Sequence, residues 1–170
     1  LIRRYKLVLG VEKKLPSRDE VEKIFTDFYF GGDPYGDTSQ WKGFIKNEPL
    51  LVDQNFFNEL SQNGYLWGFV SGAERPSAEF VLQERLGLKA PPLIAMGDAP
   101  SKPDPTGLIQ LSKSISNSQS EEEIPVIAYL GDTVADIQTV KNAQKEKPDK
   151  RFLSLAVAPP HLHNINKKVA

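Results

Sequence analysis

The stretch "IPVIAYLGDTVADIQTV", residues 124–140, decides the fold, because an apolar run ends there in a glycine and passes into a helical pattern. Two aspartates, Asp132 and Asp136, follow that glycine four positions apart. Carboxylates beyond a buried strand repel each other and lose hydration, so a bound cation is one explanation for the pair. A local explanation is that Asp132 or Thr133 caps the helix. The apolar positions of that helix are Val134, Ile137, Val140 and Ala143.

Composition excludes several classes of protein. The 170 residues fit one domain, or one domain with a small lobe, and 39% hydrophobic residues are enough for a core. No apolar run approaches the roughly 20 residues that span a bilayer. The net charge of −1 gives no basic field for nucleic acid. The absence of cysteine excludes disulfides, a thiolate nucleophile and Cys-based zinc, and it agrees with a cytoplasmic location.

The first third of the chain reads as helical. Ser17 and Glu20 form a capping box ahead of an apolar stripe, and Gly31 and Gly32 end this helix. A turn-rich linker follows, and a second helix over 52–63 closes on Gly64. The stripe consists of Val21, Ile24, Phe25 and Phe28.

The remainder repeats the order strand, small-residue turn, helix. Such alternation predicts an α/β fold, a mostly parallel sheet with helices on both faces. The polar segment 116–123 reads as a solvated loop. The expected strands lie within 65–72, 91–97, 125–131 and 151–160, and the expected helices within 76–88, 106–115 and 133–143.

Polar side chains follow three of these strands. Ser71, Lys102 and the pair Asp132 and Asp136 each come just after an apolar run. Because the carboxyl ends of parallel strands share one edge, we expect these groups to meet there. Ser71 as a helix cap and Lys102 as a solvated charge are the simpler alternatives. Prolines at 103 and 105, however, stiffen the chain beside Lys102.

Together these groups predict a phosphate site beside a divalent cation. Ser71 and adjacent backbone N–H groups, that of Gly72 included, can donate to phosphate oxygens, and Lys102 can neutralise their charge. Asp132 and Asp136 can hold Mg²⁺, which takes one or two carboxylates together with waters and a substrate phosphate. The metal would offset the carboxylate repulsion and polarise the phosphoryl group.

Three motifs resemble those of a known family. "FVSG" at 69–72, "SKPDP" at 101–105 and "YLGDTVADI" at 129–137 resemble the second, third and fourth motifs of the haloacid dehalogenase-like hydrolase superfamily. The similarity covers about residues 65–157, and the helical part before Gly64 looks like the cap of the helical-cap branch. The wording around "WGFVSGAERPSAEFVLQERLGL" looks closest to an uncharacterised cyanobacterial-type subgroup.

The resemblance implies a Rossmann-like core and magnesium-dependent phosphoryl transfer through an aspartyl-phosphate. Ser71 would bind the transferring phosphoryl group, Lys102 would stabilise its charge and that of the nucleophile, and Asp132 with Asp136 would serve Mg²⁺. Two aspartates in the fourth motif favour a phosphatase over a dehalogenase. The implied substrate is a small phosphorylated metabolite. We therefore expect a partial helical cap and linker over 1–48 and a core over 49–170 that lacks its first strand.

The family's first motif, an Asp-x-Asp that supplies the nucleophile, is absent from the sequence. Asp98 lies four residues before Lys102 and reads as the approach to the third motif. In this superfamily the first strand lies between the strands of the second and fourth motifs, so its loss leaves unpaired backbone edges. The chain starts at Leu1 and its only methionine is Met96. We expect that a missing N-terminal segment or a complementary chain completes the sheet, and that this chain alone is inactive.

Other functions remain open. A degenerate family member would bind a phosphorylated ligand or a protein partner without turnover. A receiver-like phosphoacceptor also uses acids, a small hydroxyl residue and a lysine, but its acids precede its lysine, which is the reverse of the order here. His161 and His163 suggest a metal site only weakly without a third ligand. Trp41 and Trp67 read as packing residues.

Overall fold

A computed structural model describes residues 16–116 and 126–158 of the chain. The chain divides into two compact units, Leu1–Leu50 and Leu51–Ala170. The predicted boundary between residues 48 and 49 lies close to this division, and the interpretation of the first unit as a cap stays a prediction. His161, His163 and most of the predicted loop at 116–123 lie outside the described residues.

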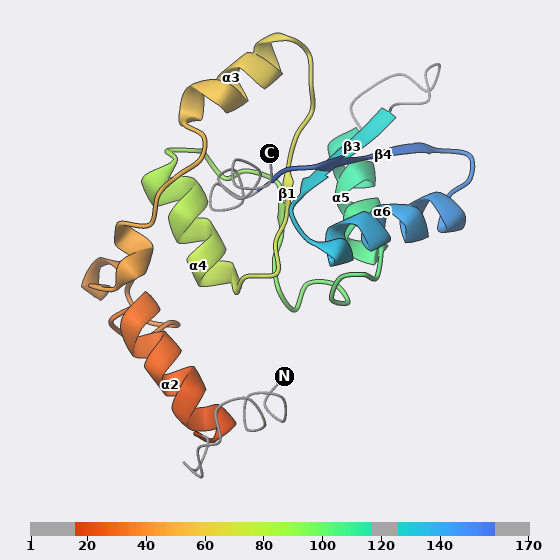
Figure 1. Cartoon of the computed structure of the whole chain (residues 1–170). Helices are drawn as coiled ribbons and strands as arrows, with labels where there is room; N and C mark the ends of the chain where they lie inside the picture. Colours follow the sequence, from red (N-terminus) through yellow and green to blue (C-terminus); the bar gives the residue numbers. More distant parts are fainter. Residues whose placement is uncertain (1–15, 117–125, 159–170) are drawn as a thin grey trace, which may run out of the picture. The chain divides into compact units, whose positions relative to one another are not determined.

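The predicted first helix is present in the first unit as α2, Arg18–Tyr29 (Figure 1). The predicted capping box is confirmed: the Ser17 hydroxyl accepts the N–H of Glu20, and the Glu20 carboxylate accepts the N–H of Ser17 at 2.7 Å. Gly31, with φ of 61°, follows the helix end as expected. The apolar stripe also forms, and its four side chains are between 51% and 66% exposed.

Trp41 holds the rest of the first unit together. Its side chain is completely buried, and its indole N–H donates to the Asp33 carbonyl at 2.8 Å. The ring packs on Phe30 with 4.9 Å between ring centroids. Two short 3₁₀ turns, η1 (Thr38–Gln40) and η2 (Phe44–Lys46), bracket it. The prediction that Trp41 is a packing residue is therefore confirmed.

The second unit contains the predicted alternation of strands and helices. It begins with α3, and the helical stretch after β1 continues from α4 into a π-helical segment, η3. The elements are α3 (Gln54–Gln62), β1 (Phe69–Val70), α4 (Arg75–Glu79), η3 (Phe80–Arg85), β2 (Leu93–Ile94), α5 (Thr106–Ser116), β3 (Val126–Gly131), α6 (Val134–Glu146) and β4 (Arg151–Ala156).

The described strands form two separate parallel pairs. β1 pairs with β2, and β3 pairs with β4 over six residues from Val126↔Arg151 to Gly131↔Ala156. Within residues 16–116 and 126–158, no strand joins one pair to the other. The α/β class and the parallel pairing are confirmed. The expectation that a shared strand is missing from the sheet stays a prediction.

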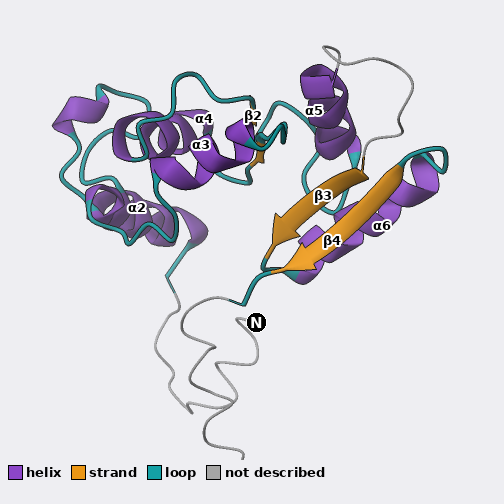
Figure 2. Cartoon of the chain, turned by 90° about the horizontal axis from the view of Figure 1, so that it is seen from above, coloured by secondary structure: helices purple, strands orange, loops and turns teal. Residues whose placement is uncertain are grey.

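The two faces of the β3–β4 pair differ. On one face α6 packs against both strands, and Leu108 of α5 joins Val140 and Ala143 of α6 in a buried cluster there (Figure 2). Side chains on the other face are between 40% and 56% exposed, namely Val126, Leu130, Leu153 and Leu155. The prediction of helices on both faces is thus met on one face only by the described residues. The strand sequences are apolar on both faces, which is typical of strands covered on both sides.

A second cluster of the same unit lies under α3 and η3. Phe57, Leu82, Leu86 and Leu88 are buried there, with Trp67, Phe69 and Leu93 packed against them. Trp67 is 4.9 Å from the Phe57 ring, centroid to centroid, so its prediction as a packing residue is also confirmed. Among the described residues, no helix combines the length and apolarity needed to cross a membrane.

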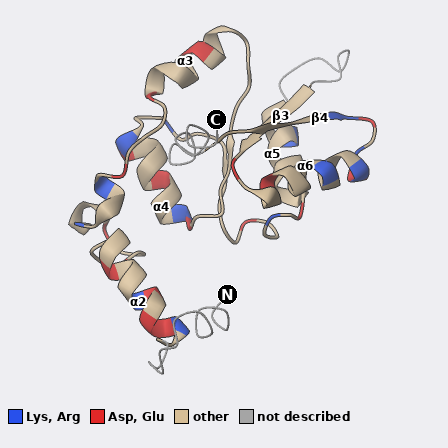
Figure 3. Ribbon diagram, viewed as in Figure 1, with Lys and Arg blue, Asp and Glu red and all other residues tan. Residues whose placement is uncertain are grey.

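Charges of both signs are spread over the helices (Figure 3). The sequence has 21 basic and 22 acidic side chains, and α2, α4 and α6 each carry both signs. The prediction that the chain does not bind nucleic acid rests on the net charge of the sequence and stays a prediction.

A methyl group at Gly43 should disrupt the first unit. The added Cβ would lie 2.3 Å from the Tyr29 carbonyl oxygen, and the obstructing atoms are backbone. We expect Gly43→Ala to cost about 3 kcal/mol and to expose Trp41, measured by denaturant unfolding with tryptophan fluorescence. Gly32→Ala is the matched control, since the atom nearest its Cβ would be an edge carbon of the Trp41 ring at 3.3 Å and backbone atoms would lie at ordinary contact distances of 3.6 and 3.7 Å. Equal losses in the two variants would contradict the prediction.

Candidate functional site

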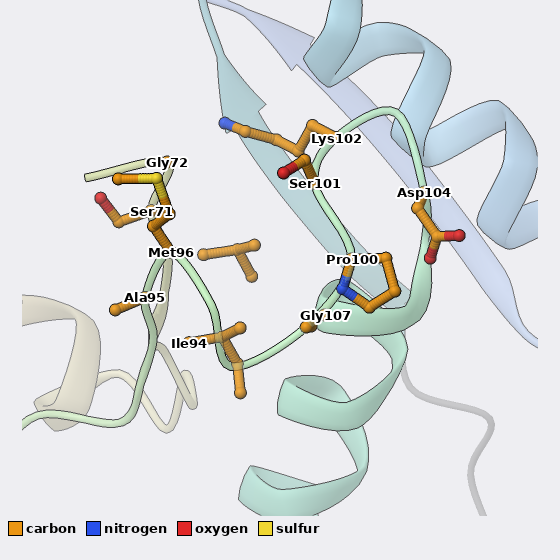
Figure 4. A pocket seen from close by; sticks show the side chains of 12 residues that line it. Ser71, Gly72, Ile94, Ala95, Met96, Pro100, Ser101, Lys102, Asp104 and Gly107 are labelled. Carbon is orange, nitrogen blue, oxygen red and sulfur yellow. The ribbon is translucent and has the colours of Figure 1, made fainter. Parts of the chain in front are cut away.

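A small pocket lies where the predicted loops meet in the second unit (Figure 4). Its volume is about 60 Å³, room for a few water molecules and far less than the several hundred Å³ of a typical small-molecule site. Ser71 and Gly72 line it after β1, and Lys102 and Asp104 line it from the loop before α5. The structure therefore brings the second and third predicted motifs to one place.

Ser71 does not cap the helix that follows it. The N-cap of α4 is Glu74, whereas the Ser71 hydroxyl accepts the N–H of Ala73 at 3.0 Å and closes a local turn. The N–H of Ser71 donates to the Ile94 carbonyl at 2.8 Å, so the backbone at Ser71 is fixed to β2. A Cβ placed on Gly72 would meet nothing within 4 Å. The backbone at Gly72 therefore has open space beside the pocket.

Lys102 forms an ion pair with Asp136. Its ammonium donates to Asp136 Oδ1 at 2.7 Å, and the Lys102 and Asp136 side chains are only 27% and 5% exposed. Figure 4 shows the Lys102 side chain extending over the pocket, toward the side on which Ser71 lies. The simpler interpretation of Lys102 as a solvated charge is wrong. The third and fourth predicted motifs are joined through this pair.

Both carboxylate oxygens of Asp136 are engaged. Oδ1 accepts from Lys102 and from the Tyr129 hydroxyl at 3.2 Å, while Oδ2 accepts from the N–H of Thr133 at 3.0 Å and from its hydroxyl at 2.6 Å. Burial disfavours the charged carboxylate, but the bonds from Lys102 and Thr133 outweigh it and lower the pKa of Asp136 to about 2. Burial likewise opposes the charge on Lys102, but the bond to Asp136 leaves the Lys102 pKa raised.

Helix capping explains the positions of Thr133 and Asp136, but it does not explain Asp132. Thr133 is the N-cap of α6, and Asp136 is its capping-box partner. Asp132 lies before the cap with its side chain exposed. No hydrogen bond or ion pair of the described residues ends on the Asp132 carboxylate. Asp132 is thus free of the capping arrangement.

The apolar run ends in a glycine, Gly131, because Asp136 packs closely against this position. A Cβ on Gly131 would lie 2.4 Å from Cβ and 2.5 Å from Cγ of Asp136, a separation that real side chains do not show. The absence of a side chain at position 131 lets the Asp136 carboxylate fold back against the end of β3. The glycine is therefore part of the arrangement that brings Asp136 to Lys102.

The donor chemistry at Asp132 and Asp136 fits Mg²⁺ in part. Mg²⁺ takes oxygen ligands and often only one or two carboxylates. The exposed Asp132 is available for this role, whereas Asp136 would have to give up one of its four donors. No group of three metal-ligating side chains occurs among the described residues. The metal-binding role of the pair stays a prediction.

Tyr129 is a site residue that the sequence interpretation missed. Its hydroxyl contacts Asp136, lies 3.4 Å from the Lys102 ammonium and 3.5 Å from the Val70 carbonyl oxygen. Burial is the main cause of its raised pKa, so the phenol stays protonated at neutral pH. The sequence signal that could have indicated Tyr129 is the alternation of side chains along β3, which places Tyr129 on the same face as Gly131.

Comparisons with known proteins show a fold and no family. No family model and no curated protein matches the sequence. The solved structure titled phosphatase Tt82 from Thermococcus thioreducens is similar to this chain, with a TM-score of 0.58 and 23% sequence identity. The similarity covers 98% of this chain, and the chain spans 64% of the length of that structure. The two proteins therefore share a fold over nearly all of this chain.

The carboxylates of Asp136 and Asp132 should contribute differently to stability. The pKa of Asp136 is depressed on folding, so its contribution is present above about pH 4 and is lost as the pH falls toward 2. We expect Asp136→Asn to lose about 2 kcal/mol of unfolding free energy at pH 7, with the loss disappearing near pH 2. Asp132→Asn, at an exposed position, should change stability by less than about 0.5 kcal/mol. Urea unfolding at several pH values measures both, and a pH-independent loss in Asp136→Asn would contradict the assignment.

Gly131 and Gly72 provide a second comparison. Gly131→Ala should displace Asp136 from Lys102 and cost about 1–3 kcal/mol, because the new methyl overlaps the Asp136 side chain. Gly72→Ala adds the same methyl group after another strand, in open space, and should be nearly neutral for stability. Thermal unfolding at neutral pH measures the difference. The steric account fails if Gly131→Ala is as stable as Gly72→Ala.

Proposed function

We propose that this chain is the larger part of a magnesium-dependent phosphatase of the haloacid dehalogenase-like hydrolase superfamily, helical-cap branch, with a Rossmann-like core. The observation that carries the proposal is the Lys102–Asp136 pair at 2.7 Å beside a pocket that Ser71 lines. A fixed ammonium, a hydroxyl and a nearby exposed carboxylate are the groups that phosphoryl transfer needs. The fold shared with a structure titled as a phosphatase supports the same conclusion.

The pocket suits a phosphoryl group better than a whole metabolite. Its volume of about 60 Å³ leaves the rest of a substrate outside, where residues beyond the pocket would recognise it. Ser71 Oγ and the Gly72 backbone would donate to phosphate oxygens. Lys102, held by Asp136, would supply a positive charge at a fixed position. We therefore infer a small phosphorylated metabolite that inserts only its phosphate.

The nucleophile belongs to a segment other than the described residues, because the sequence has no Asp-x-Asp. We propose that a missing N-terminal segment or a complementary chain supplies it on a strand between β1 and β3. One finding supports this placement: within residues 16–116 and 126–158 the two strand pairs are separate, so a strand between them is not supplied by the described residues. This chain alone would be inactive.

The proposed reaction has two displacements at phosphorus. A carboxylate oxygen of the supplied aspartate attacks phosphorus, the bond to the ester oxygen breaks, and the second aspartate protonates the leaving alkoxide. A water then attacks the aspartyl-phosphate, gives its proton to that second aspartate, and releases inorganic phosphate. Lys102 and Ser71 would stabilise the charge on the transferring group throughout. A bound Mg²⁺, held by Asp132 with Asp136 nearby, would polarise the phosphoryl group.

A non-catalytic function is the second candidate. The absence of Asp-x-Asp favours it, since every group proposed to bind phosphate is present without a nucleophile. In that case the pocket would hold a phosphorylated ligand or the phosphate of a protein partner and would leave it unchanged.

Hydrolysis of a generic aryl phosphate by the longest available gene product tests the proposal. We expect activity with Mg²⁺, loss of activity on chelation, and a decrease of at least about tenfold in Asp132→Asn. Asp149→Asn is the matched control, because it removes the same charge at an exposed turn before β4. The 170-residue chain, assayed in parallel, should show no phosphatase activity. If the long form is silent with Mg²⁺ across a broad panel of phosphate esters, the non-catalytic function is favoured.

A further inference from the structure

Arg75, the first residue of α4, forms two ion pairs of different kinds. One guanidinium nitrogen donates to Glu79 at 2.9 Å, four residues along the same helix. The other donates to Asp98, which lies 23 residues away in the loop after β2. Asp98 also accepts the N–H of Ala95 at 2.7 Å, so its carboxylate closes the turn that follows β2. Only the Asp98 pair connects separate parts of the chain.

The two connected segments line the pocket. Ser71 and Gly72 lie in the loop that Arg75 ends, and Ala95 and Met96 lie in the turn that Asp98 closes. The Met96 N–H donates to the Ala73 carbonyl at 2.9 Å, which is a second connection between the same segments. Arg75 and Asp98 do not themselves line the pocket. Their contribution to the site therefore acts through the positions of other residues.

Global stability does not account for this pair. The side chains of Arg75 and Asp98 are 45% and 31% exposed, and ion pairs at such exposure contribute little to folding because water screens both charges. The Glu79 pair, with Glu79 42% exposed, resembles it in chemistry but links only one turn of α4. The difference between the two pairs is what they connect.

We propose that Arg75 and Asp98 are positioning residues that hold the Ser71 loop against the turn after β2 and so fix the mouth of the pocket. The proposal rests on the proposed function only for the identity of the ligand. Without the pair, the two segments would depend on backbone bonds such as that between Met96 and Ala73, and they would open more often. The free energies that exposed ion pairs typically contribute correspond to an increase in this opening of about two- to fivefold when the pair is lost.

Hydrogen exchange of the Met96 amide tests the connection without any ligand, because this N–H spans the two segments. Asp98→Asn keeps an acceptor for Ala95 but removes the charge, and it should raise Met96 exchange about two- to fivefold. Glu79→Gln is the matched control, since it removes the other partner of Arg75, and it should leave that rate unchanged. Arg75→Gln should reproduce Asp98→Asn, and the double variant should add nothing. Unchanged exchange in Asp98→Asn, or the same increase in both single-carboxylate variants, would overturn the proposal.

A titration with inorganic phosphate, followed at the Ser71 and Gly72 amides by NMR, tests the consequence for binding. Asp98→Asn should weaken phosphate about two- to fivefold, and Glu79→Gln should bind like the parent chain. Equal affinity in the parent and Asp98→Asn would show that the pair does not fix the pocket. If none of these proteins binds phosphate, the proposed ligand is wrong, and the exchange rates alone decide the positioning role.

Discussion

The ion pair between Lys102 and Asp136 is the interaction on which the site depends. It joins the loop before α5 to the first turn of α6, and each partner is held by further contacts. Thr133 fixes one oxygen of Asp136 while Lys102 and Tyr129 share the other. A buried carboxylate with four donors keeps its charge, and that charge in turn keeps the ammonium in place beside the pocket. The same carboxylate, that of Asp136, thus caps α6 and holds the Lys102 ammonium in place.

Much of the fold and of the site followed from local patterns. The capping box at Ser17 is a short-range signal that needs no tertiary information. The alternation of apolar runs with helical spacing predicted the parallel pairs, because parallel strands require such crossovers. The meeting of Ser71 and Lys102 at one pocket followed from the rule that parallel strands end at a common edge. These predictions succeed where residue type and spacing determine the geometry.

Other features depend on contacts between distant residues. Tyr129 read as one more apolar position of a strand, and only the folded chain shows its hydroxyl beside Lys102. The two aspartates looked equivalent in sequence, yet one is buried as a capping partner and the other is exposed. Whether Asp136 turns toward a helix end or toward a metal depends on the donors around it. The space that Gly131 leaves for that turn is likewise visible only in three dimensions.

The uncovered face of the β3–β4 pair has a consequence for how copies of the chain behave in solution. Val126, Leu130, Leu153 and Leu155 are exposed apolar side chains on the same face of a parallel pair of strands. Charge repulsion is what usually keeps such surfaces apart, and it scales with net charge. At a net charge of −1, charge repulsion between copies of the chain is very weak. Charge therefore gives little protection against association of two copies through this face wherever the face stays exposed.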